Sequence, residues 1–439
     1  MKILHKQFEQ IDNSQLIVFR VAFGLLLMAE SFGAILTGWV RRAFIEPSVN
    51  FTTIGLEWLQ PLDGNGMYVY FAIMGVCGMM VALGYHYHWS LGFFTLLWTG
   101  AYSMQKSFYN NHYYLLILLC LLMLLVPANS YFSLDSKRKP SITSLHCRRW
   151  HINIFILLLW IVYTSAALQK IYPGWLDNEF ISISFRAKSS YWLVGEFLQE
   201  HFLQQLIVYG GILFDGTIIV FLLIPQTRKA AFMVSLIFHL FNSVVFQIGI
   251  FPYLMIALCV LFFNPATIRH IFLKQKPAVP DPQPVHFLTL PQKLLTAGLI
   301  LFFAHQIYLP LRHHHFKGNV FYTEEGHRLS WRMMLRFKTG RLNYEVTDLA
   351  SDSTWVVYPK DFLTSKQTSA MAGKPDMIWQ FAQHLKKEYA IQGKKVSIKA
   401  HAKARLNLGE EYTLIDPQID LAATNWNRFQ HSDWILSPN

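Results

Sequence analysis

Long apolar runs, separated by short polar segments, fill the chain from residue 16 to residue 309. A helix needs about 20 predominantly apolar residues to cross a bilayer. Nine runs approach that length, at 16–39, 67–84, 89–106, 113–132, 152–170, 204–224, 230–250, 252–266 and 293–309. Only Phe251 and Pro252 separate the seventh run from the eighth. The pattern predicts a membrane all-α bundle of about nine transmembrane helices.

The texture of the chain changes near Arg312, where charged residues become more frequent. Short stretches that alternate apolar and polar residues follow at 343–347, 354–358, 396–399 and 412–415, with turn residues between them. Apolar residues recur at helical spacing over 376–389 and predict one amphipathic helix. We therefore expect a transmembrane domain at 1–311 and a mostly β extracytoplasmic domain at 312–439. A proline-rich linker at 276–291 leads into the last apolar run.

Basic residues in the loops orient the predicted bundle, because short cytoplasmic loops carry an excess of lysine and arginine. They gather after the fourth, sixth and eighth runs, as Lys137, Arg138, Lys139, Arg148, Arg149, Arg228, Lys229, Arg269, Lys274 and Lys276. This distribution places the N-terminus in the cytoplasm and the region after Arg312 outside. Arg41 and Arg42, in the first outer loop, are the main exception.

Composition supports the membrane class: 53% of the residues are hydrophobic and 15% are charged, against roughly 25% charged in soluble proteins. The net charge of +12 follows from basic loops beside an anionic membrane, so we expect no nucleic-acid partner. Three of the four cysteines lie within apolar runs, and no cysteine spacing suits a disulfide framework or a metal. The adjacent histidines at 313–315 point in different directions, so we expect no metal there.

Lys170 closes the fifth apolar run, which carries no other charge from Ile152 onward. A lysine at the end of a spanning segment is commonly an anchor whose ammonium reaches the membrane interface. The other interpretation is a buried reactive amine, because an apolar environment favours the neutral form of an amine over the ammonium. The position of Lys170 alone is compatible with both.

Several other polar residues of the apolar runs fall toward the same end of the predicted bundle. They are Asn111, His112, His239, Asn242 and Gln247, and Asp215 lies nearer to mid-membrane. An unpaired polar group is costly inside a bilayer. These residues therefore form hydrogen bonds between helices, with the Asn110–His112 stretch as a helix cap, or they line a buried reaction centre open to the outside. Asp215 is then the partner of a cation or a protonated acid.

The chain resembles the vitamin K-dependent γ-glutamyl carboxylase family nearly from end to end. The similar segments occur in the same order and are 19–24 with Glu30-Ser31, 106–115, 167–175, 209–215, 238–243 with 248–251, 323–327, 330–334, 375–378 and 415–417. The transmembrane part also resembles that of bacterial relatives. The resemblance implies an integral-membrane lyase that couples epoxidation of a reduced naphthoquinone by O2 to CO2 addition at a glutamate γ-carbon.

What the resemblance implies for single residues is specific. Lys170 stands where the family has its catalytic lysine, and His112 stands where it has a histidine after two asparagines. Gln169 replaces the first lysine of the family's usual Lys-Lys pair. Reduced vitamin K is the implied cofactor, with O2 and CO2 as co-substrates and no metal. A lipid-soluble quinol and a glutamate-containing protein or peptide are the implied partners.

This chemistry explains the residue types. A γ-hydrogen of glutamate is too weakly acidic for a side-chain base, whereas a quinol hydroxyl is within reach of a neutral amine such as Lys170. His112 would stabilise an oxyanion, while Asn111, Asp215, His239, Asn242 and Gln247 are candidate residues for holding the quinol. A dry pocket is required, because water would quench strong bases.

Two other functions remain open at this point. One is a quinol-linked oxidase or epoxidase that does not carboxylate proteins, and the other is a non-enzymatic membrane transporter or assembly protein. The shorter length of the chain than vertebrate members of the family, and its lack of a disulfide in the outer region, favour a bacterial cytoplasmic membrane. The region after Arg312 would then be periplasmic.

Overall fold

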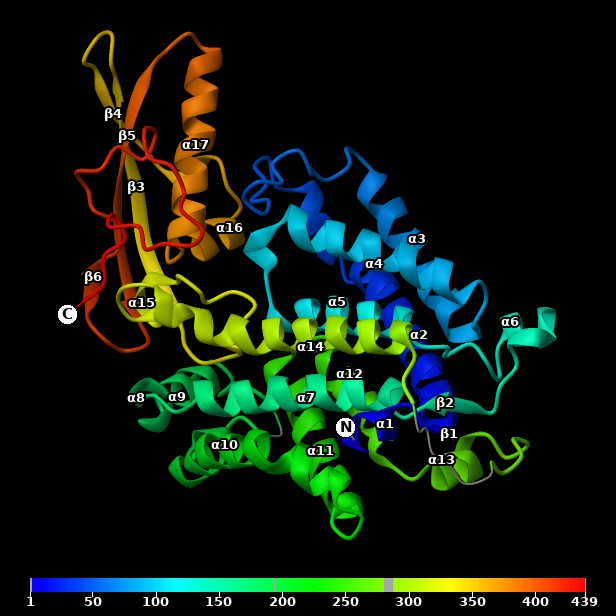
Figure 1. Cartoon of the computed structure of the whole chain (residues 1–439). Helices are drawn as coiled ribbons and strands as arrows, with labels where there is room; N and C mark the ends of the chain where they lie inside the picture. Colours follow the sequence, from blue (N-terminus) through cyan, green and yellow to red (C-terminus); the bar gives the residue numbers. More distant parts are fainter. Residues whose placement is uncertain (1, 193, 280–286, 439) are drawn as a thin grey trace.

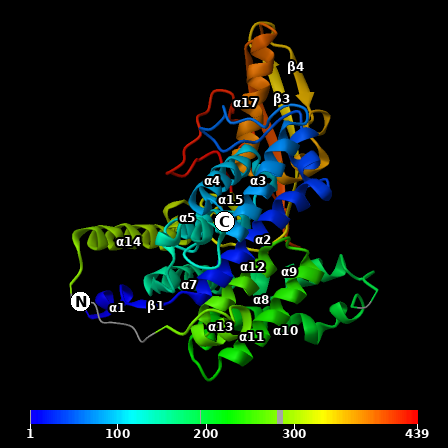
Figure 2. The same cartoon turned by 90° about the vertical axis from the view of Figure 1, so that its right-hand side faces the viewer.

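The computed structural model describes residues 2–192, 194–279 and 287–438. Part of the linker expected at 276–291 lies outside these residues. A helical part extends from α1 (Lys2–Gln7) to α14 (Leu290–Leu311), and a region that contains a β-sheet adjoins it at one end (Figures 1 and 2). In Figure 1 the sheet and α17 (Pro375–Ile391) stand above the helical part at the left.

Six helices among the described residues are long and apolar enough to cross a membrane. They are α2 (Ser14–Leu36), α3 (Gly66–Leu83), α7 (Trp150–Gln169), α10 (His201–Leu223), α11 (Arg228–Phe241) with η5 (Asn242–Phe246), and α14 with η7 (Arg312–His315). A seventh would comprise α12 (Phe251–Leu258), η6 (Cys259–Phe262) and α13 (Pro265–Phe272), which bend by 118°. The chain is a multi-pass membrane protein, and the expected count of nine spans is not confirmed.

Two of the nine predicted spans, α4 (Tyr87–Met104) and α5 (Asn111–Leu124), form helices that are not both long enough and apolar enough to count as membrane-spanning. α4 has 18 residues, and hydroxyl groups recur along it, including those of Thr95 and Thr99. α5 has 14 residues, or about 21 Å at 1.5 Å per residue, which is shorter than the ~30 Å hydrocarbon core. The apolar run continues to residue 132, but the helix ends before Pro127, which cannot continue it.

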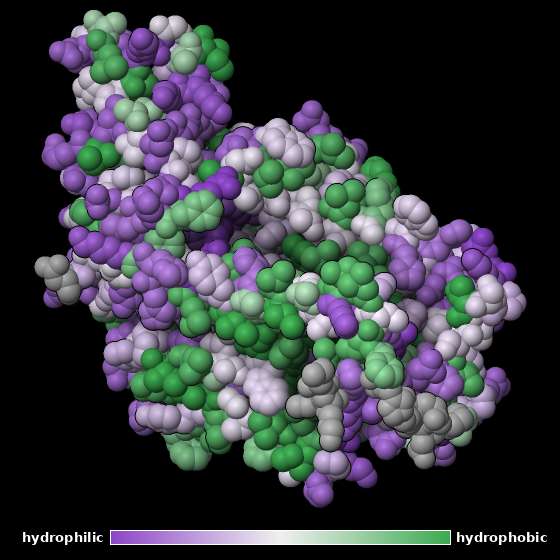
Figure 3. All heavy atoms as spheres, in the orientation of Figure 1, coloured by the Kyte–Doolittle hydropathy of each residue, from purple (hydrophilic) through white to green (hydrophobic). Residues whose placement is uncertain are grey.

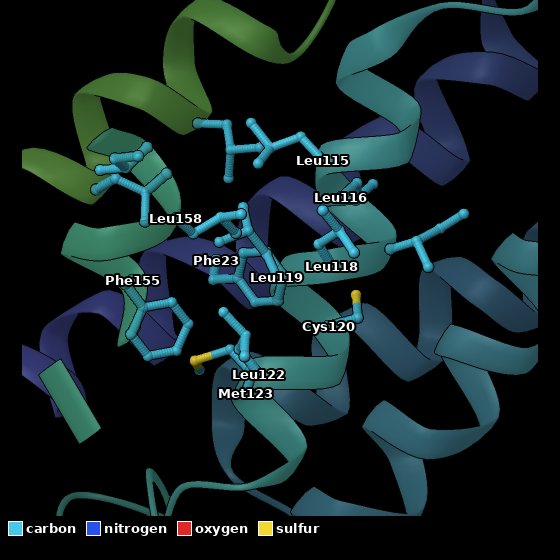
Figure 4. Packing of buried hydrophobic residues seen from close by; sticks show 14 of the residues in the cluster. Phe23, Leu115, Leu116, Leu118, Leu119, Cys120, Leu122, Met123, Phe155 and Leu158 are labelled. Carbon is cyan, nitrogen blue, oxygen red and sulfur yellow. The ribbon is translucent and has the colours of Figure 1, made fainter. Parts of the chain in front are cut away.

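α5 lies inside the helical part, where its neighbours shield it from lipid. Ten of its 14 residues are buried, and nine of them join a large hydrophobic cluster with α2, α3, α4, α7 and α12. Figure 4 shows this cluster, in which side chains of α5 such as Leu119 face Phe23 of α2 and Phe155 of α7. A helix surrounded in this way does not need full membrane length.

The outward faces of the helical part are apolar. On α14, more than half of the surface of Leu294, Ile300, Leu301 and Ile307 is exposed. Figure 3 shows apolar residues over the helices and polar residues over the sheet region. Exposed apolar side chains on this scale mark a surface that contacts lipid or another protein.

Four antiparallel strands form the C-terminal sheet in the order β4-β3-β5-β6. They are β3 (Lys338–Asp348), β4 (Thr354–Val357), β5 (Val396–Leu406) and β6 (Glu411–Thr413). Buried and exposed residues alternate along β5, as in a sheet with one covered face. α17 contributes Met377, Phe381 and Leu385 to the hydrophobic cluster on that face. The expected strands and helix are present, and β3 and β5 are longer than the alternating stretches.

The loop after α2 joins the helical part to the C-terminal region. Val49 and Phe51 of this loop belong to the hydrophobic cluster of the sheet. Other short elements are β1 (Gln10–Asp12), η1 (Arg41–Ile45), η2 (Lys106–Phe108), α6 (Leu134–Arg138), β2 (His146–Arg148), α8 (Pro173–Leu176), α9 (Glu179–Arg186), α15 (Val320–Thr323) and α16 (Ser365–Met371).

Candidate active site

A cavity of about 920 Å³ lies where the helical part meets the C-terminal region. Side chains of α5, α7, α10 and α11 line its inner half, and loops of the C-terminal region line its outer half together with the loop after α2. The molecular surface is hollowed between these two parts (Figure 3). The volume falls within the usual range of small-molecule pockets, about 300–1,000 Å³.

Lys170 and Asp215 form an ion pair in the inner half of the cavity. Lys170 follows the last residue of α7, and Asp215 lies on α10. The Lys170 Nζ is 2.5 Å from Asp215 Oδ2 and 3.5 Å from the carbonyl oxygen of Gly211. The two side chains expose only 11% and 7% of their surface. With so little water around them, the ammonium and the carboxylate each depend on the other as the main charge partner.

The end of α7 fixes the position of this pair. Pro173 lies four residues after Gln169, the last residue of α7, and begins α8, so the chain turns at Lys170. The ring of Trp175 lies 5.2 Å from Lys170 Nζ, and its indole N–H donates to the carbonyl of Val208 over 3.1 Å. Gln169 is not among the residues that line the cavity, and it donates to the carbonyl of Ser330 over 3.1 Å. Gln169 therefore ties α7 to the C-terminal region.

The three residues at the start of α5 have different roles. Asn110 caps the helix, since its side-chain oxygen accepts from the amide of Tyr113 over 2.9 Å. Asn111 donates to the carbonyl of Arg332 over 3.0 Å. His112 lines the cavity, with its ring 5.9 Å from that of Phe251. Within the described ranges no residue hydrogen-bonds the His112 imidazole, so it is available to a ligand.

A second histidine lines the inner half. Tyr163 of α7 and His239 of α11 are hydrogen-bonded, with 2.9 Å between the phenolic oxygen and Nε2. His239 is fully buried, and its Nδ1 has no partner in the part of the chain that the structure describes. Asn242 lines the cavity one turn further along. A buried ring nitrogen without a partner calls for a hydrogen bond from a ligand or water.

Gln247 is the one predicted site residue that does not line the cavity. It is exposed, has a left-handed backbone with φ 53°, and donates to the phenolic oxygen of Tyr191 over 3.0 Å. The segment after α11 widens into the π-helical η5 and ends at Phe246, so helical spacing from His239 no longer applies. Asn111, His112, Lys170, Asp215, His239 and Asn242 do lie around one cavity.

The outer half of the cavity is rich in charge. Asp376 accepts hydrogen bonds from Lys106 Nζ over 2.8 Å and from Arg328 Nη2 over 3.1 Å. Burial alone would raise the pKa of Asp376, but Arg328 and Lys106 hold it well below its ordinary value. The second guanidinium nitrogen of Arg328, Nη1, is buried and has no partner among the described residues.

Two further cations in the outer half have no carboxylate partner in the described part of the chain. They are Lys374 and Arg332, which both line the cavity. The nearby Glu324 is already paired with Arg336 and Lys338. Positive charge therefore exceeds negative charge in a partly desolvated space, which favours an anionic ligand.

The charged outer residues were not among the sequence candidates. Lys106 lies at the end of an apolar run, Asp376 at the start of a helix, and Arg328 and Lys374 in loops. Each of them alone resembles an ordinary surface charge. Among the described residues, no group of three or more His, Cys, Asp or Glu side chains could hold a metal ion.

Comparison with protein families divides the chain into two parts, and nearly all of α14 falls in the second part. The HTTM domain model matches residues 8–266, and the model of the vitamin K-dependent gamma-carboxylase lumenal domain matches residues 291–439. No solved structure matches the chain. Lys170 and Asp215 fall in the first match, and Arg328 and Asp376 fall in the second. The chain therefore belongs to the vitamin K-dependent gamma-carboxylase family, with an HTTM domain followed by that family's lumenal domain.

Proposed function

We propose that this protein is an integral-membrane enzyme that couples oxidation of reduced vitamin K by O2 to addition of CO2 at a glutamate γ-carbon. One observation carries the proposal: a single cavity joins the buried Lys170–Asp215 pair to a cation-rich outer half. In this proposal, residues 1–311 form the transmembrane domain and residues 312–439 form the extracytoplasmic domain. When bound, reduced vitamin K would supply an oxidisable ring, and oxidation of this ring by O2 would provide a base stronger than any side chain.

The inner half fits a quinol ring. Ile117, Val162, Phe238 and Phe251 contribute apolar walls, and a lipid-soluble ring leaves the bilayer for such walls at little cost. The partnerless Nδ1 of His239 supports the assignment. A hydroxyl or carbonyl oxygen of the ring would satisfy it.

His112 and Asn242 would complete the contacts to the ring. Their side chains line the same inner half, and no hydrogen bond to another described residue occupies them. Donors that are already in place stabilise an oxyanion without reorganising when the charge develops. His112 is therefore assigned to oxyanion stabilisation, and His239 with Asn242 to orientation of the ring.

Lys170 and Asp215 would accept the quinol proton together. An ammonium cannot take up a proton, but the carboxylate beside it can, and the ammonium then remains as the counter-charge of the oxyanion left behind. The alternative starting form, an amine beside a carboxylic acid, would accept the proton at nitrogen and reach the same final state. The Nζ–Oδ2 contact thus makes the pair, rather than the lysine alone, the proposed base.

The outer half would bind the glutamate side chain. Lys374, Arg332 and the partnerless Nη1 of Arg328 can neutralise its carboxylate. The same cations would lower the free energy of the negative charge that develops when the γ-hydrogen leaves. The hydrogen bond from Asn111 to the Arg332 carbonyl brings this cation beside the start of α5 and thus beside His112.

For the location of the protein, we propose a bacterial cytoplasmic membrane with the N-terminus in the cytoplasm and residues from 312 onward in the periplasm. The basic loops support this orientation. The outer half of the cavity would then open to the periplasm, where a secreted protein could present glutamate. The quinol would reach the inner half from the lipid.

A reconstituted assay tests the proposal. The purified full chain in detergent receives reduced vitamin K, O2, labelled bicarbonate and a glutamate peptide, and both epoxide and fixed label are followed. We expect both products, each dependent on the quinol. Epoxide without label, for every glutamate peptide, would indicate a quinol-linked epoxidase. Absence of both products would contradict the proposal and leave a transport or assembly role.

A further inference from the structure

A second, much smaller cavity adjoins the main one near the ends of α3, α4 and α5. Its volume is about 20 Å³, which is enough for one small molecule, since a single water needs about 10–15 Å³. Aromatic side chains and Ala101 form most of its wall, and Tyr102 and Tyr109 line both cavities. The mechanism proposed above uses neither the small cavity nor these two tyrosines.

Four aromatic rings pack edge to face around the ring of Trp39, which follows α2, and give the small cavity apolar walls. They belong to Phe44, Phe71, Phe108 and Tyr113, and their centroids lie between 5.5 and 6.0 Å from that of Trp39. Flexible side chains such as methionine fill irregular gaps in a protein interior. Planar rings that meet edge to face cannot do so, and the space between them stays open.

The wall offers little to a water molecule. Trp98 and Gln105 line the small cavity, but Trp98 donates to the carbonyl of Tyr113 over 3.2 Å and Gln105 donates to Asn50 Oδ1 over 3.1 Å. Of the lining side chains, that of Tyr102 has the one buried polar atom without a partner among the described residues. An internal water typically makes about three hydrogen bonds. An apolar molecule therefore suits this cavity better than water does.

Tyr102 and Tyr109 form the wall that the two cavities share, with ring centroids 5.9 Å apart. Two hydrogen bonds hold the Tyr109 hydroxyl, which donates to Asn111 Oδ1 over 2.9 Å and accepts from the amide of Leu329 over 2.6 Å. Arg328, a cation of the outer half, lies over the Tyr109 ring at 5.2 Å. The Tyr102 hydroxyl has no partner in the described part of the chain. The Tyr102 ring can therefore move without breaking a hydrogen bond, whereas the Tyr109 ring is fixed.

We propose that the small cavity binds a small apolar gas, which passes the Tyr102 ring to reach the outer half of the main cavity. The identity of the gas rests on the proposed function, because O2 and CO2 are the co-substrates of that reaction. Both are small and apolar, and both cross lipid without a carrier. A gas molecule held beside the main cavity would shorten the time during which a strong base or carbanion is exposed to water.

Xenon tests the site without any turnover, because this apolar atom occupies dry apolar cavities. Crystals of the full chain under xenon pressure should show xenon between Trp39, Phe71 and Trp98. Ala101→Val adds two methyl groups to the wall and should exclude the xenon. The matched control Ala34→Val adds the same groups at a buried position outside the walls of both cavities, and xenon should remain.

A second variant enlarges the small cavity instead of filling it. Phe44→Leu removes ring atoms from the wall and should raise the xenon occupancy at a given pressure by at least about twofold. Three results would overturn the inference: ordered water in place of xenon in the wild-type protein, xenon retained in Ala101→Val, or unchanged occupancy in Phe44→Leu.

Steady-state kinetics identify the gas. In Ala101→Val the KM for O2 in epoxide formation, or the KM for CO2 in fixation of label, should rise by at least about threefold while kcat and the KM for the quinol stay unchanged. The gas whose KM rises is the occupant, and Ala34→Val should change neither value. Unchanged KM values for both gases would overturn the inference. Xenon binding in a wild-type protein that forms neither product would reject the proposed function alone.

Discussion

At the scale of single residues, the environment of Lys170 differs from that of a membrane anchor. An anchoring lysine keeps its ammonium in water, whereas the side chain of Lys170 is 11% exposed and contacts a carboxylate. Lys170 and Asp215 are both recognisable in the sequence, but 44 positions separate them, so the sequence does not show that they form an ion pair. Pairing of this kind depends on how α7 packs against α10, which the hydrophobic pattern alone does not specify.

The pair predicts a role for Asp215 equal to that of Lys170. Asp215→Asn keeps the shape of the side chain but leaves the ammonium without a proton acceptor beside it. We expect epoxide formation and carboxylation to fall together by about 100-fold or more, measured as initial rates on purified protein. The control Asp433→Asn changes an exposed carboxylate outside the cavity and should retain activity. Near-normal rates in Asp215→Asn would make Asp215 a structural partner only.

The proposed carboxylate contacts predict a pH dependence of peptide binding. Burial, reinforced by the charge of Arg328, lowers the pKa of Lys374 to about 8. Lys374 is therefore mainly protonated below this pH and loses its charge as the pH rises through it. The KM for a glutamate peptide should rise above about pH 8.

A permanent charge isolates this effect. Burial also lowers the pKa of Lys106 to about 8, although Asp376 opposes that shift, so the wild-type profile contains both groups. Lys374→Arg keeps a cation at high pH and should flatten the rise in KM. An identical profile in Lys374→Arg would assign the titration to another group.

At the scale of helices, the number of spans illustrates what an apolar pattern can establish. Each of the nine apolar runs coincides with a helical segment of the structure. The pattern finds these segments because each has a long apolar surface, whether that surface is buried or exposed. It does not show that α5 is short and enclosed, because the apolar run continues through a turn. It also does not show that η5 changes the helical spacing, and this is why Gln247 was grouped with His239.

Close packing of α2 against α3 provides a test at this scale. A side chain at Gly24 of α2 would collide with the backbone nitrogen of Ala82, whereas the space around Gly33 of the same helix is open. We expect Gly24→Ala to destabilise the protein by about 1–3 kcal/mol. Gly33→Ala should be neutral or slightly stabilising. Thermal unfolding in detergent measures both, and equal midpoints would show that the helices can separate at no cost.

At the scale of the whole molecule, the family resemblance and the distribution of charged residues predict more of the domain order and of the site than the hydrophobic periodicity does. The order of a helical part followed by a sheet region, and the positions of Lys170 and His112, follow from the residues and from the resemblance. The outer cations do not, because residues as far apart as Lys106, Arg328 and Asp376 meet only in the folded chain. Their meeting needs the connection between α4 and α5, which carries Lys106, to pack against the C-terminal region.

The orientation of the molecule is a separate prediction. With the N-terminus in the cytoplasm, Asp135 lies inside and Lys338 outside. Reporters that distinguish the two compartments, fused at these positions, should label opposite sides of the membrane. The positive loops give the physical reason. Labelling on the same side would reject this topology and would also remove the periplasmic route proposed for the peptide.

The most direct test of the proposed chemistry is Lys170→Ala in the purified protein, with epoxide and fixed CO2 measured in the same reaction. We expect both products to disappear together, because both follow from proton transfer to the Lys170–Asp215 pair. Lys170→Arg distinguishes the two starting forms of the pair: a guanidinium stays protonated, so activity is lost if the nitrogen accepts the quinol proton and persists if the Asp215 carboxylate does. Both variants should still insert and bind the quinol. Undiminished epoxide formation by Lys170→Ala would contradict the proposed base and leave Lys170 as a structural partner of Asp215.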